Sequence, residues 1–274
     1  MTTSSSTPTV KPAWTGMVPV DDTALAVTDT GGPGIPVIYL NGSYASQRHW
    51  RGVVRDLGSG YRHITFDERA RGRSGLSADY SFEACVRDID AVLAARGVHR
   101  ALLVGWSYGA LLGVHWADRN PDRALGVVGV DGPYPVGWTD EAGHAEIRKV
   151  FGRMKPMMPV ARRLGLAARF SAELHADLAI ESHHLHAAIG PVLEDLPVPV
   201  RYVVASGEAL GSRDDLQEQM RKALDPLLAS NPDLRVSAKV TSNHGSILRK
   251  DSPAVAAAVR ELAAAPRAQD EPSR

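Results

Sequence analysis

A serine between two closely spaced glycines is the residue of this chain best placed for covalent chemistry. Residues 105–109 have the sequence Gly-Trp-Ser-Tyr-Gly, between an apolar run at 101–104 and a stretch with helical spacing at 109–118. Glycines at these positions let a strand and a helix approach through a tight turn. Such a turn directs the serine hydroxyl at the helix N-terminus, where backbone N–H groups favour a developing anion. The pattern therefore predicts Ser107 as a nucleophile.

The elements around this turn alternate between strand and helix. A hairpin is indicated at residues 15–20 and 24–29. Further strands, as short apolar runs bounded by turn residues, are expected at 36–40, 63–66, 101–104, 125–130, 198–205 and 234–240. Helical spacing is found at 46–57, 81–95, 109–118, 214–228 and 253–265. This order predicts an α/β fold with a mostly parallel eight-stranded sheet and helices on both faces.

The alternation stops after residue 136. Residues 137–196 contain no strand candidate and are expected to form a helical cap over the sheet edge. The α/β core is then expected at 13–136 and 197–265. The Ser/Thr-rich residues 1–12 and the polar residues 266–274 are expected to be disordered.

Four motifs in the right order make the chain similar to the α/β-hydrolase superfamily, from about residue 16 to residue 264. Along the chain they are Asn-Gly-Ser at 41–43, the run Asp-Glu-Arg-Ala-Arg-Gly-Arg-Ser at 67–74, the serine turn at 105–109, and Asn-His-Gly at 243–245, which precedes the last helix. The run at 67–74 resembles the D-x-R-G-x-G-x-S run of the superfamily. The resemblance implies the α/β-hydrolase fold and a serine nucleophile.

A serine hydroxyl needs a general base at neutral pH, and histidine is the usual one. The chain has ten histidines. His244 lies in a polar loop between the last strand and the last helix, where the resemblance implies the base. His183, His184 and His186 lie together, but no carboxylate or cysteine accompanies them at ligand spacing, so no metal site is expected.

The third member of the triad is where the chain departs from the superfamily. Members usually carry an aspartate a few residues after the seventh strand, but Leu210 occupies that position here. Two alternatives remain. Asp131 follows the sixth strand, where some members place their acid, and Glu208 lies in the usual loop but two residues early. We favour Asp131; either carboxylate would have to be buried, fix the tautomer of His244 and stabilise its cation.

The oxyanion hole is expected to use two backbone N–H groups. The resemblance implies Tyr108, directly after the nucleophile, and Ser43, in the loop after the third strand. Asn41 replaces the usual histidine of that loop, and its amide is expected to tether it.

Large side chains near these motifs are candidates for the pocket wall, although ordinary core packing is the alternative. Trp106, Tyr44 and Trp138 are the expected substrate-binding residues. Met154, Met157 and Met158 are further candidates from the cap.

Composition limits the partners. The 31 Lys and Arg residues balance 31 Asp and Glu residues, which gives no reason to expect nucleic acid or an anionic membrane as a partner. No apolar stretch is long enough to span a bilayer, and the first residues lack signal-peptide features. We expect a small-molecule substrate and a cytoplasmic location; the sequence does not indicate an oligomeric state.

These features together predict a serine hydrolase that cleaves a small ester, lactone or related acyl substrate through an acyl-serine, with no cofactor or metal. Thioester, amide and carbon–carbon bond cleavage stay open. The resemblance implies an aspartate nucleophile for epoxide hydrolases and haloalkane dehalogenases, so Ser107 argues against both. The alternatives are a catalytically weak ligand-binding protein, which Leu210 favours, and a cofactor-free lyase or oxygenase on the same fold.

Overall fold

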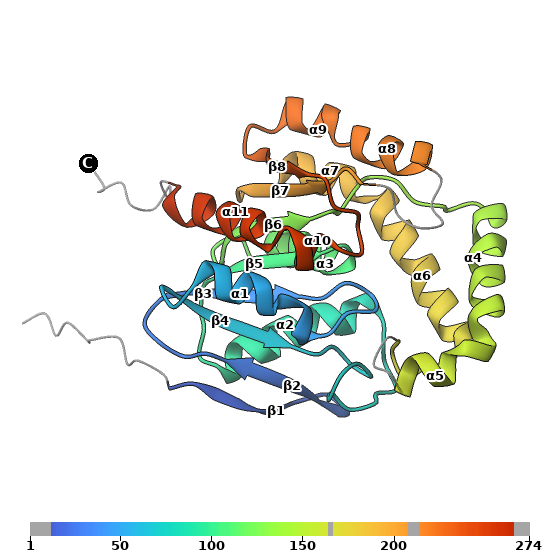
Figure 1. Ribbon diagram of the computed structural model, residues 1–274, viewed down its shortest axis with the longest axis horizontal. Coiled ribbons are helices and arrows are strands. Elements are labelled where there is room, and N and C mark those ends of the chain that lie inside the picture. Colours follow the sequence, from blue (N-terminus) through green and yellow to red (C-terminus); the bar gives the residue numbers. More distant parts are fainter. Residues whose placement is uncertain (1–11, 164–166, 208–213, 266–274) are drawn as a thin grey trace, which may run out of the picture.

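An eight-stranded sheet runs through the computed structural model, which describes residues 12–163, 167–207 and 214–265 (Figure 1). The strand order is β1-β2-β4-β3-β5-β6-β7-β8. The first two strands pair antiparallel and join β4 antiparallel, whereas β3 to β8 run parallel. The strands are β1 (Trp14–Val20), β2 (Thr23–Asp29), β3 (Ile35–Leu40), β4 (Tyr61–Phe66), β5 (Ala101–Trp106), β6 (Ala124–Val130), β7 (Val200–Ala205) and β8 (Leu234–Val240).

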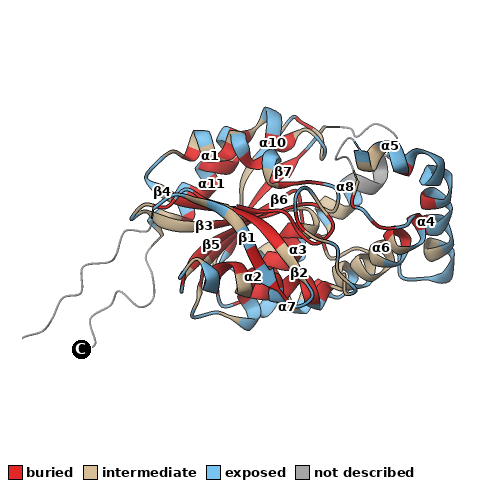
Figure 2. Ribbon diagram, turned by 90° about the horizontal axis from the view of Figure 1, so that it is seen from below, coloured by how far each residue is buried: buried red, intermediate tan, exposed pale blue. Residues whose placement is uncertain are grey.

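Helices cover both faces of this sheet, and the burial pattern of each strand follows from that. Ile38 and Leu40 of β3 lie in one core cluster, whereas Val37 and Tyr39 lie in the other. The first cluster includes α2 (Phe82–Ala95) and α3 (Tyr108–Arg119), and the second includes α1 (Arg51–Leu57) and α11 (Ser252–Ala264). Figure 2 shows the buried strands between these two layers. The predicted α/β-hydrolase fold is confirmed.

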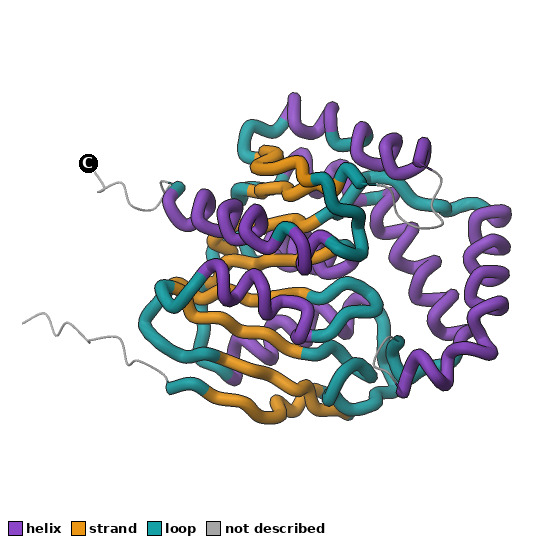
Figure 3. Tube along the Cα trace, viewed as in Figure 1, coloured by secondary structure: helices purple, strands orange, loops and turns teal. Residues whose placement is uncertain are grey.

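A helical insertion stands beyond one end of the strands (Figures 1 and 3). It contains α4 (Glu141–Met154), η2 (Lys155–Met157), α5 (Met158–Arg163) and α6 (Ala172–Ala187). Ile147 and Phe151 of α4 pack with Ala176 of α6 in a small apolar cluster of their own. The insertion is thus held together by its own contacts.

The next helix, α7 (Ile189–Asp195), falls within the range expected for the cap but packs elsewhere. Its Ile189 and Leu193 are fully buried in the main core, and the helix contacts α3. The part that stands off the sheet therefore ends near residue 187, because α7 returns to the face of the sheet.

Two further details differ from expectation. The single helix expected at 214–228 is two helices, α8 (Asp214–Lys222) and α9 (Asp225–Ser230), and Pro226 lies in the first turn of α9. Proline suits a first turn but lacks the N–H that a continuous helix needs. The short helices η1 (Gln47–Trp50) and α10 (Ile247–Lys250) complete the fold. Residues 1–11 and 266–274, expected to be disordered, lie outside the described residues. Within the described residues, no helix is long and apolar enough to cross a membrane.

Candidate active site

Ser107 occupies a sharp turn between β5 and α3. Its backbone has φ 55° and ψ −115°, and α3 begins at the next residue. A Cβ on Gly105 would overlap the Gly109 carbonyl, and a Cβ on Gly109 would overlap the Leu40 carbonyl. The two glycines are therefore needed for the strand and the helix to approach, and the turn presents Ser107 at the carboxyl edge of the sheet.

His244 and Asp131 come together at the same edge. His244 lies in the loop after β8, and Asp131 directly follows β6. The distance from His244 Nδ1 to Asp131 Oδ2 is 2.7 Å. Because a carboxylate only accepts, Nδ1–H donates to it and Nε2 is left able to take a proton. The alternative acid, Glu208, lies outside the described residues.

The Asp131 carboxylate is buried and well partnered. Its side chain is 4% exposed, and its Oδ1 accepts hydrogen bonds from the Tyr134 hydroxyl (2.6 Å) and the Ala205 N–H (3.2 Å). Burial alone would raise the pKa of Asp131. The hydrogen bonds from His244 and Tyr134 and the nearby Arg221 guanidinium outweigh it and hold this pKa below its usual value. Asp131 is therefore an anion at neutral pH, as an orienting acid must be.

The loop after β3 is fixed from several sides. Asn41 donates from Nδ2 to Glu68 Oε2 (2.9 Å) and to the Phe66 carbonyl (2.7 Å), and its Oδ1 accepts from Trp50 (2.8 Å). Arg71 donates from Nε to the Ser43 carbonyl (2.8 Å). Asn41 thus tethers the loop that carries Ser43.

The second expected oxyanion donor lies at the start of a helix. Tyr108 is the first residue of α3. The N–H groups of a first helical turn have no partner inside the helix, so that of Tyr108 is available to an anion.

A cavity of about 430 Å³ unites these groups between the sheet edge and the insertion. Ser43, Ser107, Asp131 and His244 line it from the core. Its other walls come mainly from apolar and aromatic side chains of the loop after β6, of α4 and of α6, together with two residues of α8. These residues are Tyr44, Tyr134, Val136, Trp138, Ile147, Val150, Phe151, Ala179, Ser182, His183, His186, Met220 and Arg221.

Several expected wall residues are not in this lining. Tyr44 and Trp138 line the cavity, but Trp106 does not: its ring lies 5.6 Å from the His244 ring and packs against the core cluster of Tyr39. Met154 and Met157 are 42% and 70% exposed, and Met158 is buried away from the cavity. Trp106 does not line the cavity because side chains alternate along β5, and its ring points to the other face of the sheet.

The two histidines of the insertion that line the cavity, His183 and His186, add no positive charge to it at neutral pH. His183 stacks on Trp138 with a centroid distance of 5.3 Å. Burial lowers the pKa of His183 and lowers that of His186 to about 4. Within the described residues, no group of three or more His, Cys, Asp or Glu side chains is arranged to hold a metal ion.

Two residues of the site were not anticipated from the sequence. Tyr134 reaches Asp131 from three residues further along the chain, and Arg221 of α8 has its Nε 4.0 Å from Asp131 Oδ1. The sequence contained a weak indication of Tyr134, because this residue directly follows the Asp-Gly-Pro turn at 131–133. Arg221 had none, because only the tertiary fold brings α8 to the cavity.

Comparisons with known proteins agree with this architecture. Residues 35–158 match the family model described as alpha/beta hydrolase fold. A haloalkane dehalogenase of Mesorhizobium japonicum is 30% identical over 140 residues, which are 50% of this chain and 45% of that protein. Epoxide hydrolase B of Mycobacterium tuberculosis is 35% identical over 102 residues, which are 36% of this chain and 29% of that protein. The chain thus spans less than half the length of these curated relatives.

Solved structures match over nearly the whole chain. A thermophilic esterase from Thermogutta terrifontis superposes with a TM-score of 0.68 at 20% identity, covering 92% of this chain and 98% of that one. A thioesterase domain from the curacin biosynthetic pathway gives a TM-score of 0.67 at 16% identity, covering 91% and 100%. At such identities the likeness shows the fold. The family-model match and these superpositions agree on the α/β-hydrolase fold.

Proposed function

We propose that this protein is a serine hydrolase that cleaves a small ester, lactone or related acyl compound. The observation that carries the proposal is one cavity lined by Ser107, His244 and Asp131, with His244 Nδ1 held 2.7 Å from the Asp131 carboxylate. A serine at a strained turn, a histidine with a free Nε2 and a buried anion are the parts of a nucleophilic triad.

The reaction follows from these positions. Ser107 Oγ attacks the acyl carbon while His244 Nε2 takes the hydroxyl proton, and Asp131 stabilises the resulting imidazolium. The carbonyl oxygen becomes an anion that the N–H groups of Tyr108 and Ser43 bind. His244 then gives its proton to the departing oxygen, leaving an acyl-serine. Water attacks the acyl-serine, passes a proton to His244, and Ser107 recovers that proton as the acid leaves.

The identity of residue 107 separates this proposal from the activities named for the curated relatives. Those relatives are named as haloalkane dehalogenases and epoxide hydrolases. The resemblance implies an aspartate nucleophile for both activities, whereas this chain has Ser107 at the turn. A serine gives an acyl enzyme that water can cleave, which favours ester-type substrates.

Labelling with a fluorophosphonate tests the proposal directly. The reagent should add once to the wild type, as measured by intact mass, and not to Ser107→Ala. Ser182→Ala, which removes another serine of the same cavity, is the matched control and should label like the wild type. Peptide mapping should place the adduct on Ser107.

The proposal would be abandoned if neither the fluorophosphonate nor a smaller sulfonyl fluoride reacted with the wild type. A panel of p-nitrophenyl esters and lactones supplies the second arm. Turnover that survives in Ser107→Ala would likewise contradict the mechanism, because it would have to come from another group.

A further inference from the structure

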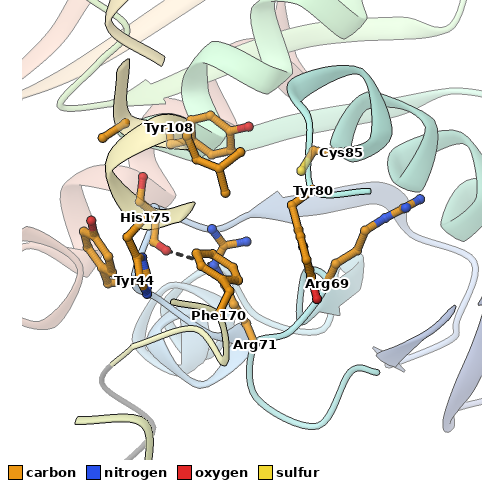
Figure 4. A pocket seen from close by; sticks show the side chains of 11 residues that line it. Tyr44, Arg69, Arg71, Tyr80, Cys85, Tyr108, Phe170 and His175 are labelled. Carbon is orange, nitrogen blue, oxygen red and sulfur yellow. Dashed lines mark hydrogen bonds between the residues drawn. The ribbon is translucent and has the colours of Figure 1, made fainter. Parts of the chain in front are cut away.

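A second, smaller cavity of about 40 Å³ lies beside the catalytic one (Figure 4). Ser43, Tyr44 and Ala179 line both cavities, so the two are neighbours at the loop that carries the expected oxyanion donor. A volume of this size holds roughly three water molecules, or one small polar group such as a carboxylate.

Arg71 contributes a positive charge to the wall of this side cavity. Its guanidinium lies among the lining side chains in Figure 4, and its Nε donates to the Ser43 carbonyl at 2.8 Å. Within the described residues, no acceptor takes a hydrogen bond from its two Nη groups, and no carboxylate lies within 4.0 Å of it. The Phe170 ring centroid is 6.0 Å from Arg71 Cζ. The fork of the guanidinium is thus available to a ligand.

The charge of Arg71 is poorly balanced by its surroundings. The described residues that line the side cavity include no Asp or Glu. Arg69 also lines the side cavity, but its charge is balanced by Asp88 and Asp21, with which its guanidinium forms ion pairs at 2.7 Å. Glu68 lies near enough for its charge to interact with that of Arg71, but it does not line the side cavity, and both of its carboxylate oxygens accept hydrogen bonds from Asn41.

The other walls add no charge at neutral pH. They are mostly aromatic and apolar, among them Tyr44, Tyr80, Tyr108 and Phe170. Burial lowers the pKa of His175 to about 4, so this imidazole is neutral. Its Nε2 is buried without a hydrogen-bond partner within the described part of the chain. A cation in such a setting favours an anion strongly, because few waters screen it.

We propose that the side cavity binds a carboxylate carried on a short arm of the substrate, and that Arg71 is the residue that selects it. The proposal rests on the proposed serine hydrolase function and narrows its substrate class to acidic half-esters and similar compounds. A guanidinium fork matches a carboxylate with two parallel hydrogen bonds. The reacting carbonyl would then lie at the catalytic cavity while the arm reaches past Ser43 and Tyr44.

Two substrates that differ in one methyl group test the selectivity. We would compare kcat/KM for p-nitrophenyl hemiglutarate and for its neutral methyl ester. The wild type should prefer the charged ester by about tenfold or more, the usual effect of a charged hydrogen bond. Arg71→Met should slow both esters, because Arg71 also holds Ser43, but the charged ester should lose at least about tenfold more.

Three further variants test whether the preference for the charged ester comes from Arg71 or from another arginine. Arg71→Lys keeps the charge and should retain part of the preference. Arg73→Met removes an exposed arginine two residues further along the same loop and should leave the preference unchanged. Arg221→Met removes the guanidinium that lines the catalytic cavity. If Arg221→Met abolishes the preference and Arg71→Met keeps it, the side cavity is not the carboxylate site.

Binding without turnover tests the site independently of catalysis. Calorimetry with Ser107→Ala should show binding of monomethyl glutarate that weakens about tenfold or more when Arg71→Met is added. Equal binding by the two proteins, or none by the first, would overturn the carboxylate site. Failure of the serine hydrolase itself would look different: no fluorophosphonate adduct and no turnover of the neutral ester.

Discussion

Ser107 and Asp131 directly follow two neighbouring parallel strands, and both have a positive φ, of 55° and 48°. The Ser107 N–H donates to the Val130 carbonyl at 3.0 Å, and the Asp131 N–H donates to the Val203 carbonyl at 2.9 Å. Each residue therefore continues the sheet hydrogen bonding through its N–H and then turns away. A residue held in a sparsely populated backbone region costs on the order of 1 to 3 kcal/mol, and such residues cluster at functional sites.

The first prediction concerns the acid. Asp131→Asn should lower kcat for a p-nitrophenyl ester by on the order of 10³- to 10⁴-fold, because an amide cannot fix the His244 tautomer or stabilise its cation. Glu208→Gln, the change in the alternative acid, should keep most of the activity. The assignment would be wrong if the effects of the two substitutions were reversed.

The second prediction concerns the hydroxyl that supports the acid. Tyr134→Phe removes the 2.6 Å hydrogen bond to Asp131 Oδ1. We expect kcat to fall by about tenfold with little change in KM, since a hydrogen bond to a charged group contributes roughly 1.5 to 3 kcal/mol and Ala205 and His244 still hold the carboxylate. Steady-state kinetics measure this, and an unchanged kcat would show that Tyr134 has no positioning role.

The third prediction concerns the turn around Ser107. Gly109→Ala should lower the free energy of unfolding by about 2 to 3 kcal/mol or more, because its Cβ meets the Leu40 backbone. Gly152→Ala in α4 is the matched control: its Cβ meets nothing within 4 Å, and alanine should stabilise the helix by roughly 0.5 to 1 kcal/mol. Urea denaturation measures both, and equal stability of the two variants would refute the packing argument.

The fourth prediction concerns acid stability. The pKa of His175 is lowered by burial from 6.5 to about 4 in the folded protein. Between these values the unfolded chain binds more protons, so stability is lost as the pH falls from 6.5 toward 4. His175→Phe keeps a ring among Phe151 and Phe170 and removes this dependence.

Urea denaturation at about pH 7.5 and about pH 5 measures this effect. His175→Phe should lose less stability than the wild type between the two, by roughly 1 to 2 kcal/mol. His99→Gln removes an exposed histidine and should behave like the wild type. A pH dependence shared by all three proteins would place the effect elsewhere.

Local patterns predicted what local sequence controls. Six strands followed from short apolar runs and two from a hairpin signal, and the turn at 105–109 followed from glycine spacing, because a Cβ at residue 105 or 109 would meet neighbouring backbone. The split of the expected helix at 214–228 was missed even though Pro226 was visible, since proline is tolerated in a first helical turn.

Residues that act through the tertiary fold were harder to foresee. Arg221 reaches Asp131 only because the helix α8 meets the turn after β6 at one cavity. Trp106 shows the opposite error: it is adjacent to Ser107 in sequence, but its ring lies 5.6 Å from the His244 ring and outside the cavity lining. A position next to the nucleophile in sequence does not predict that a side chain enters the cavity, because the strand geometry sets the direction of that side chain.

The attachment of Ser107 and Asp131 to adjacent strands makes their alignment independent of the helical insertion. Their separation is set by the fixed spacing between strands, about 4.8 Å, whereas most of the wall facing them belongs to the insertion, which has its own small core. The reactive groups and most of the facing cavity wall thus lie on different parts of the chain. Replacing the insertion would change the shape of the catalytic cavity while Ser107 and Asp131 keep their alignment.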